Sequence, residues 1–301
     1  MSPTQKHDGF ELGDELTFVE GKGGLPFIKV DNDYAQALIS IYGGQVLSFK
    51  SKPADNDLLF LSEKATYESG KAIKGGIPIC WPWFGQDPEK KGRPAHGFAR
   101  NSMWQLVKTT SNKAALNKTG TTQIVLALKD SEATKKLWPH SFKLSLTITI
   151  GKTLKLTLKT TNRSKQAFSI TQALHTYFAV KDITKTRLAG LENAQYIDTT
   201  KEGYPLLTQQ GEITFKQEVD RIYTQGSDVS LLDDDKQCVR IKPKASKTTV
   251  VWNPWSEISK NSGDLDDNAY QQFVCIETAN AWDDIIEVLP NESFELGVEY
   301  F

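Results

Sequence analysis

Two strand-like segments of the chain contain a histidine and a glutamate that could work together as an acid and a base. In SITQALHTYFAV, an extended backbone places His175 on one face with Ala173 and Tyr177, because strand side chains alternate. In QQFVCIETAN, Glu277 directly follows an apolar run, which indicates a position at the end of a strand or a partly buried one. Histidine and carboxylate are common proton-transfer groups near neutral pH. The simpler alternatives are a structural histidine within a sheet and a strand-end carboxylate in solvent.

Aromatic and cationic residues crowd a third segment, KGGIPICWPWFGQDPEKKGRPAHGFARNSMWQL, which runs from Lys74 to Leu106. Its four prolines exclude a regular helix, because each removes a backbone donor and restricts the residue before it. It also lacks the alternation of a half-buried strand. The segment contains His96, Arg93 and Arg100. It could be a rigid plug over one end of a sheet, or the wall of a site for carbohydrate.

Motifs for other chemistry are missing from the sequence. The histidines are His7, His96, His140 and His175, and none has the H-x-H or H-E-x-x-H spacing of a metal site. The GKGG at Gly21 lacks the length and the Ser/Thr of a P-loop. No G-x-G-x-x-G opens a helix, as a dinucleotide site requires, and no G-x-S-x-G provides a nucleophilic serine. We therefore expect no cofactor and no metal. Acid–base chemistry and carbohydrate recognition remain.

Composition and charge limit the partners of the protein. The 301 residues have a formal net charge of -1, so we expect no nucleic acid and no membrane among its partners. The first residues do not form a secretory signal, and no apolar run approaches the roughly 18 residues of a membrane span. Cys80, Cys238 and Cys275 are odd in number and far apart, as is typical of free thiols in a reducing compartment. We expect a cytoplasmic monomer.

Strand patterns dominate the elements that must position these residues. The clearest is a hairpin, in which apolar and polar residues alternate over 142–150 and again over 154–158. Further strands are expected at Ala35–Ile41, Val46–Lys50, Thr122–Lys129, Thr248–Trp252, Phe273–Glu277 and Phe294–Tyr300. Helical patterns are few, and the best candidates are Lys64–Ala72 and Glu132–Trp138. The sequence therefore predicts an all-β fold, a large antiparallel β-sandwich or a barrel with few short helices, as one domain over residues 1–301.

Five segments together resemble the hexose-6-phosphate mutarotases, also called glucose-6-phosphate 1-epimerases, of the aldose 1-epimerase superfamily. They are GKAIKGGIPICWPWFG, PAHGFARNSMW, ALHTYFAV, VDRIY and CIETA, in the family's order. The resemblance implies a galactose mutarotase-like β-sandwich with a sugar on its concave face. It implies His175 and Glu277 as the catalytic pair, and it assigns substrate binding to four further residues: Lys74, His96, Arg100 and Asp220.

The implied reaction interconverts the α and β anomers of a hexose 6-phosphate, with glucose 6-phosphate as the expected substrate. Glu277 as a carboxylate would take the proton of the C1 hydroxyl, while His175 as an imidazolium would donate one to the ring oxygen. The ring opens, the aldehyde end rotates, and the ring closes on its other face. The aromatic segment would then be a rim of the site, with its aromatic side chains as the wall and Lys74, His96 and Arg100 pointing inward.

The sequence departs from the family at two positions. Lys74 occupies the place of the usual arginine before two glycines, which keeps the charge but not the planar fork that grips phosphate. Ala95 stands where some relatives have glutamine. Three alternatives stay open: an epimerase of unphosphorylated aldoses, a non-catalytic sugar-phosphate binder, and a glycoside hydrolase that pairs Asp220 with Glu277.

Overall fold

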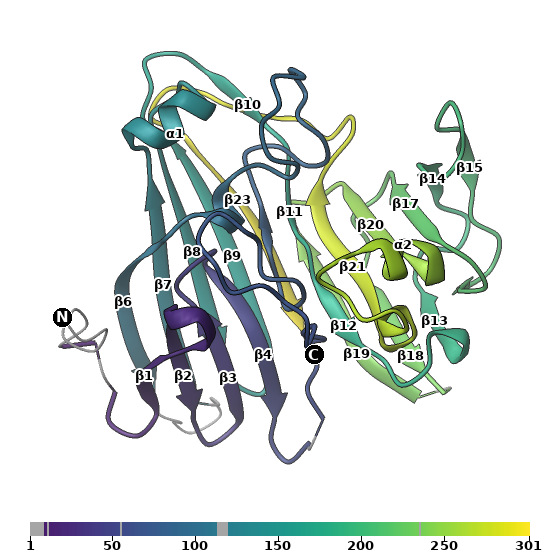
Figure 1. Cartoon of the computed structure of the whole chain (residues 1–301), viewed down its shortest axis with the longest axis horizontal. Coiled ribbons are helices and arrows are strands. Elements are labelled where there is room, and N and C mark those ends of the chain that lie inside the picture. The colour runs from purple at the N-terminus through teal and green to yellow at the C-terminus, as the bar shows by residue number, and fades with distance from the viewer. Residues whose placement is uncertain (1–8, 11, 55, 113–119, 235) are drawn as a thin grey trace.

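The computed structural model describes residues 9–10, 12–54, 56–112, 120–234 and 236–301, and strands make up most of its regular structure (Figure 1). A nine-stranded sheet has the order β16 (Ile213–Thr214), β13 (Thr186–Ala189), β18 (Val229–Asp233), β19 (Lys236–Lys244), β23 (Ser293–Tyr300), β9 (Leu154–Asn162), β8 (Phe142–Ile150), β7 (Thr121–Lys129) and β6 (Gln105–Asn112). An eight-stranded sheet has the order β15 (Leu206–Thr208), β14 (Gln195–Asp198), β17 (Val219–Tyr223), β20 (Thr248–Asn253), β21 (Phe273–Asn280), β11 (Gln172–Leu174) and β5 (Ile79–Cys80), and β12 (Tyr177–Ala179) also pairs with β21.

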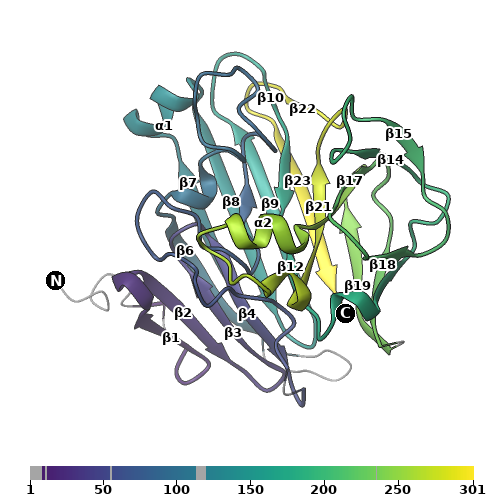
Figure 2. The ribbon, with the colours of Figure 1, turned by 45° about the vertical axis from the view of Figure 1, so that its right-hand side comes forward.

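Two smaller sheets complete the strands. The four-stranded sheet has the order β1 (Leu16–Glu20), β2 (Pro26–Asp31), β3 (Ala35–Ser40) and β4 (Gln45–Ser51), and β10 (Phe168–Ile170) pairs with β22 (Ile286–Val288). Figure 2 shows the four-stranded sheet beside β6, β7 and β8. Asn32 fixes it there, because its Nδ2 donates to Thr122 Oγ1 at 3.0 Å and to the carbonyl of Ile150 at 3.1 Å. The predicted antiparallel β-sandwich is confirmed.

The alternation seen in the hairpin sequence produces the core. The inward residues of β8 are buried and those between them are not: Phe142, Leu144, Leu146, Ile148 and Ile150. They join Val274 and Ile276 of β21 in one large apolar core between the two main sheets. Burial of this apolar surface is the main stabilising term of such a sandwich.

Strand β21 is buried on both of its faces. Val274 and Ile276 contribute to the main core. Cys275, Glu277 and Ala279 point to the opposite face, because strand side chains alternate. We call this opposite face of the eight-stranded sheet the Glu277 face. The segment after α2 (Trp255–Asn261), which Figure 1 shows over this sheet, packs on it through buried Leu265 and Ala269.

The helix predictions were half right. Helix α1 (Glu132–Leu137) forms where it was expected and begins with a capping box between Ser131 and Thr134. The segment Lys64–Ala72 is not helical but turns, because the Tyr42 hydroxyl accepts from Gly70 N–H at 2.9 Å and donates to the Lys71 carbonyl at 2.8 Å. Helix α2 was not predicted. Among the described residues, no helix is long and apolar enough to cross a membrane.

Candidate active site

The strand register places His175 directly opposite Glu277. On one side of His175, Ala173 of β11 pairs with Ala279, and on the other side Tyr177 of β12 pairs with Cys275. Both pairs follow the same antiparallel register, so the break between β11 and β12 at His175 does not shift the register. His175 Nε2 lies 3.2 Å from Glu277 Oε1. The two side chains are therefore close enough for the proton transfer that an acid–base mechanism needs.

Burial changes the charge of both members of this pair. His175 is 7% exposed and Glu277 is 1% exposed. Burial lowers the pKa of His175 well below its usual value, and His96, Arg100 and Lys74 lower it further. Burial also raises the pKa of Glu277 well above its usual value, and Asp220 adds to this rise while Arg100 opposes it. In the free protein the neutral form of each group is thus favoured, contrary to the charged pair expected from the sequence.

Two atoms of the pair are still open to a new partner. His175 Nδ1 and Glu277 Oε2 have no hydrogen-bond partner among the described residues, although both atoms are buried. Buried polar atoms without a partner are uncommon and costly. Sugar hydroxyl groups could satisfy both atoms.

A tight backbone crossing places His96 next to His175. Their ring centroids lie 5.7 Å apart. The chain here passes so close to Trp81 that a Cβ on Gly97 would lie 2.0 Å from the Trp81 carbonyl oxygen, and Gly97 has a φ of +74°. Only glycine fits this position without strain. His96 itself has a φ of 62°, which is costly for a residue with a side chain.

His96 is neutral near pH 7, because its pKa is lowered. Burial lowers its pKa to about 3, and the charges of Arg100 and Lys74 act in the same direction. Its Nδ1 accepts from Gly85 N–H at 3.3 Å. This contact leaves the ring proton on Nε2, so His96 can donate one hydrogen bond to a ligand but does not supply a charge.

Arg100 lies in the short 3₁₀ turn Ala99–Asn101. One of its terminal nitrogens donates to the Ala95 carbonyl at 3.1 Å, and its buried Nε has no partner among the described residues. Its positive charge lowers the pKa of both His96 and His175. Arg100 is therefore close enough to the pair to attract an anion to it.

Lys74 approaches the same face from the other side of the segment. Its Nζ lies 5.8 Å from the ring centroid of Trp252 and 3.5 Å from Asp264 Oδ1. Trp252 pairs with Cys275 in the sheet, so its side chain lies on the Glu277 face. In the free protein, the cation expected to hold phosphate is thus already paired with a carboxylate. Asp264 was not predicted, because it lies in a loop without any motif.

Asp220 is on the same face, in β17, which lies one strand farther from β21 than β20 with Trp252 does. It pairs with Trp252 across β17 and β20. Burial raises its pKa, and Asp198 adds to this rise while Thr199 opposes it. The register and the electrostatic coupling of Asp220 to Glu277 place it on this face. His96 contacts His175, Lys74 contacts Trp252 and the charge of Arg100 acts on His175, so all six residues named from the sequence lie near one another.

Most of the aromatic segment is core and not a wall of this site. Trp81 is fully buried, and its ring centroid lies 4.5 Å from that of Phe142 in β8. Phe98 and Trp104 belong to the same core. Phe84 alone of these aromatic residues packs against the small apolar residues of the Glu277 face, where its ring centroid is 5.0 Å from that of His96. The predicted aromatic wall is wrong, because the sandwich core takes up these large side chains.

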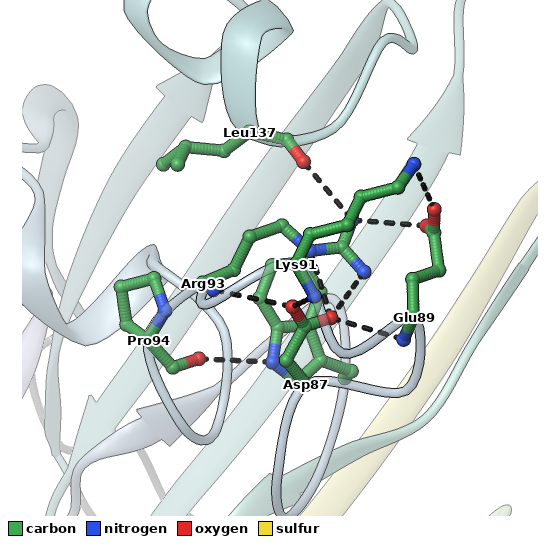
Figure 3. A network of polar contacts seen from close by, with 7 residues as sticks. Asp87, Glu89, Lys91, Arg93, Pro94 and Leu137 are labelled. Atoms are coloured by element: carbon green, nitrogen blue, oxygen red, sulfur yellow. Dashed lines mark hydrogen bonds and ion pairs between the residues drawn. The ribbon is translucent and has the colours of Figure 1, made fainter.

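A polar network fixes the outer part of the segment (Figure 3). The Asp87 carboxylate accepts from the backbone N–H groups of Glu89, Lys91 and Arg93 and from Arg93 Nε. Arg93 also donates to the Leu137 carbonyl at 3.0 Å, at the end of α1. Arg93 therefore ties the loop to α1.

Asp87→Asn is expected to lower the melting temperature by a few degrees at neutral pH. The hydrogen bond from Arg93 lowers the pKa of Asp87 well below its usual value, so the ionised form is the one that stabilises the fold. This contribution is present above the unfolded pKa near 4 and is lost as the pH falls through the lower folded pKa. Thermal unfolding between pH 3 and 7 should show the difference between variant and wild type shrink toward acid. Glu89→Gln, on the exposed side of the network, is the matched control.

Comparison with known proteins identifies the family. The model of the aldose 1-epimerase family matches residues 26–300, and the chain belongs to this family. It is an isomerase that interconverts the anomers of an aldose. Among the described residues, no group of three or more His, Cys, Asp or Glu side chains could hold a metal ion.

Individual relatives agree with this assignment. A protein of Escherichia coli K12 with the provisional name glucose-6-phosphate 1-epimerase is 36% identical over 260 residues, which cover 85% of this chain and 84% of that protein. A protein of Cenchrus ciliaris with the same provisional name is 37% identical over 249 residues, which cover 81% and 74%. The crystal structure of a provisionally named mutarotase of Salmonella typhimurium superposes with a TM-score of 0.86 at 30% identity, covering 97% of this chain and 94% of that one.

Proposed function

We propose that this protein interconverts the α and β anomers of a hexose 6-phosphate, with glucose 6-phosphate as the main substrate. Glu277 is the base and His175 the acid. The observation that supports this proposal most is the buried contact of 3.2 Å between His175 Nε2 and Glu277 Oε1. The provisional names of the relatives support the choice of substrate.

The neutral forms favoured in the free protein are compatible with this chemistry. The proton belongs to the pair and not to either residue, so the two groups titrate together. A bound sugar brings hydroxyl groups to His175 Nδ1 and Glu277 Oε2, and hydrogen bonds to the charged forms favour those forms. Moving the proton from Glu277 to His175 then yields a carboxylate for the C1 hydroxyl and an imidazolium for the ring oxygen.

The 6-phosphate would lie between Lys74 and Arg100, whose charges both act on His175. Membership of the aldose 1-epimerase family speaks against the glycoside hydrolase alternative. The non-catalytic binder is disfavoured because the acid–base pair is intact. A cytoplasmic location, a monomeric state and a single domain over residues 1–301 stay predictions from the sequence.

Lys74→Ala is expected to raise KM for glucose 6-phosphate roughly tenfold or more with little change in kcat, because it removes a charge that binds both ground and transition states. KM for unphosphorylated glucose should change little. Asp264→Asn is the matched control and should have the opposite sign, since it removes the carboxylate 3.5 Å from Lys74 Nζ. Polarimetry of freshly dissolved anomers measures these rates. Equal turnover of glucose and its 6-phosphate by the wild type would instead identify an epimerase of free aldoses.

A further inference from the structure

Two exposed aromatic residues from separate loops meet near the site. The ring centroids of Tyr204 and Trp282 lie 6.0 Å apart, with their planes at 88°. The residues are 54% and 42% exposed. Their φ angles are 50° and 58°, a conformation that is costly for residues with side chains. Such strained residues cluster at ligand-binding positions, so the pair is a candidate for a function of its own.

The loops that carry the pair begin on strands that are not neighbours. Tyr204 lies between β14 and β15, and Trp282 lies between β21 and β22. Strands β17 and β20 separate β14 from β21 in the sheet. At about 4.8 Å for each strand spacing, β14 and β21 are roughly 14 Å apart. The two loops therefore reach toward each other across β17 and β20.

This contact lies on the Glu277 face. The other face of the sheet is filled by the main core, to which Val251 and Ile276 belong. The exposed side chains of Tyr204 and Trp282 cannot lie in that core. The Glu277 face has a separate cluster of mostly small apolar side chains, and Ala281 of this cluster directly precedes Trp282. The aromatic pair thus stands over the same face as the catalytic pair.

A row of paired residues connects the two places. Glu277 pairs with Val250, Val250 with Ile222, Ile222 with Ile197, and Ile197 with Leu206 at the sheet edge. The row is buried as far as Ile197, and Leu206 at its end is 54% exposed. Across the sheet, β20 and β17 lie one and two strand spacings from β21, or roughly 5–10 Å. A second sugar ring, linked to the hexose at Glu277, would occupy this distance.

We propose that Tyr204 and Trp282 form a second sugar subsite, which stacks on the pyranose ring attached to the reducing hexose held at His175 and Glu277. Two perpendicular rings offer one face and one edge to the apolar C–H surface of a pyranose, and the tyrosine hydroxyl offers a hydrogen bond. The ligand class is a reducing disaccharide or a longer glycan. The inference rests on the proposed function for the position of the first ring only.

The test compares monosaccharides with reducing disaccharides. Anomer exchange of glucose, glucose 6-phosphate, maltose and cellobiose is measured by NMR exchange spectroscopy for the wild type, Tyr204→Ala and Trp282→Ala. Each variant should lower kcat/KM for a disaccharide roughly tenfold through KM and change the monosaccharide values by less than about twofold. Trp282→Phe should retain most of the disaccharide activity. Phe301→Ala, which removes an aromatic residue that is 52% exposed at the end of the chain, is the matched control.

A binding measurement separates this inference from the proposed function. Saturation-transfer NMR with methyl cellobioside, whose ring cannot open, should show contact of the non-reducing ring with the wild type and its loss in Trp282→Ala. That result would support the subsite even if no anomer exchange of glucose 6-phosphate were observed. In the kinetic test, equal losses of kcat/KM for glucose and cellobiose in the variants, or no loss for either sugar, would overturn the proposed subsite. A change in mass by light scattering in the variants would also overturn it, because it would make this surface, with exposed Leu206 and Leu207, an interface between copies.

Discussion

Glu277→Gln is expected to remove nearly all anomer exchange, with kcat lowered on the order of 10²–10⁴-fold. The amide keeps the size and shape of the carboxyl group but cannot take the proton of the C1 hydroxyl. The fold should persist, because burial raises the pKa of Glu277 and favours its uncharged form in the free protein, which the amide resembles. Polarimetry of fresh α-glucose 6-phosphate measures the loss, and thermal unfolding checks the fold.

Asp233→Asn is the matched control for this substitution. Asp233 is a buried carboxylate in β18, outside the eight-stranded sheet, and it accepts from Lys181 N–H at 3.1 Å. The same change from carboxyl to amide there should affect stability and leave kcat unaltered. A Glu277→Gln enzyme with close to wild-type kcat would show that Glu277 is not the base.

His175→Asn is expected to lower kcat by a similar factor, on the order of 10²–10⁴-fold, while binding of the sugar changes little. The asparagine amide takes the place of Nδ1 and can still meet a sugar hydroxyl group, but it loses the Nε2 contact to Glu277 and has no group that protonates near neutral pH. Rates for glucose 6-phosphate give kcat, and titration with a methyl glycoside, which cannot open, gives the affinity. Lost affinity with unchanged kcat would assign His175 to binding and leave the acid unidentified.

The fold class could be predicted because alternation is a local property of the chain. The hairpin of β8 and β9 is visible in its sequence, since apolar inward residues alternate with polar outward ones along β8 and the first half of β9, up to Leu158. The short helix α2 and the turns at 64–72 could not be predicted. Their conformation depends on distant partners, such as the Tyr42 hydroxyl that holds Gly70 and Lys71.

The candidate site follows the same division. The motifs named His175, Glu277 and four further residues, whose roles stay proposals. The register brings His175, Glu277 and Asp220 to one face, and ring contacts bring His96 and Lys74 to it. The sequence could not show which aromatic residues border this face. Trp81 and Phe84 are three positions apart and similar in character, yet one lies in the sandwich core and the other beside His96.

The sequence by itself determined the strands, the reactive residue types and the family resemblance, because these depend on local pattern and on residue identity. Only the tertiary structure decided the charge state of the pair, since burial and the neighbouring charges of Arg100, Lys74 and Asp220 come from separate parts of the chain. It also decided that Lys74 meets Asp264 and that Tyr204 meets Trp282. Contacts of this kind depend on how strands far apart in sequence pair and on where their loops turn, which no local pattern of residues records.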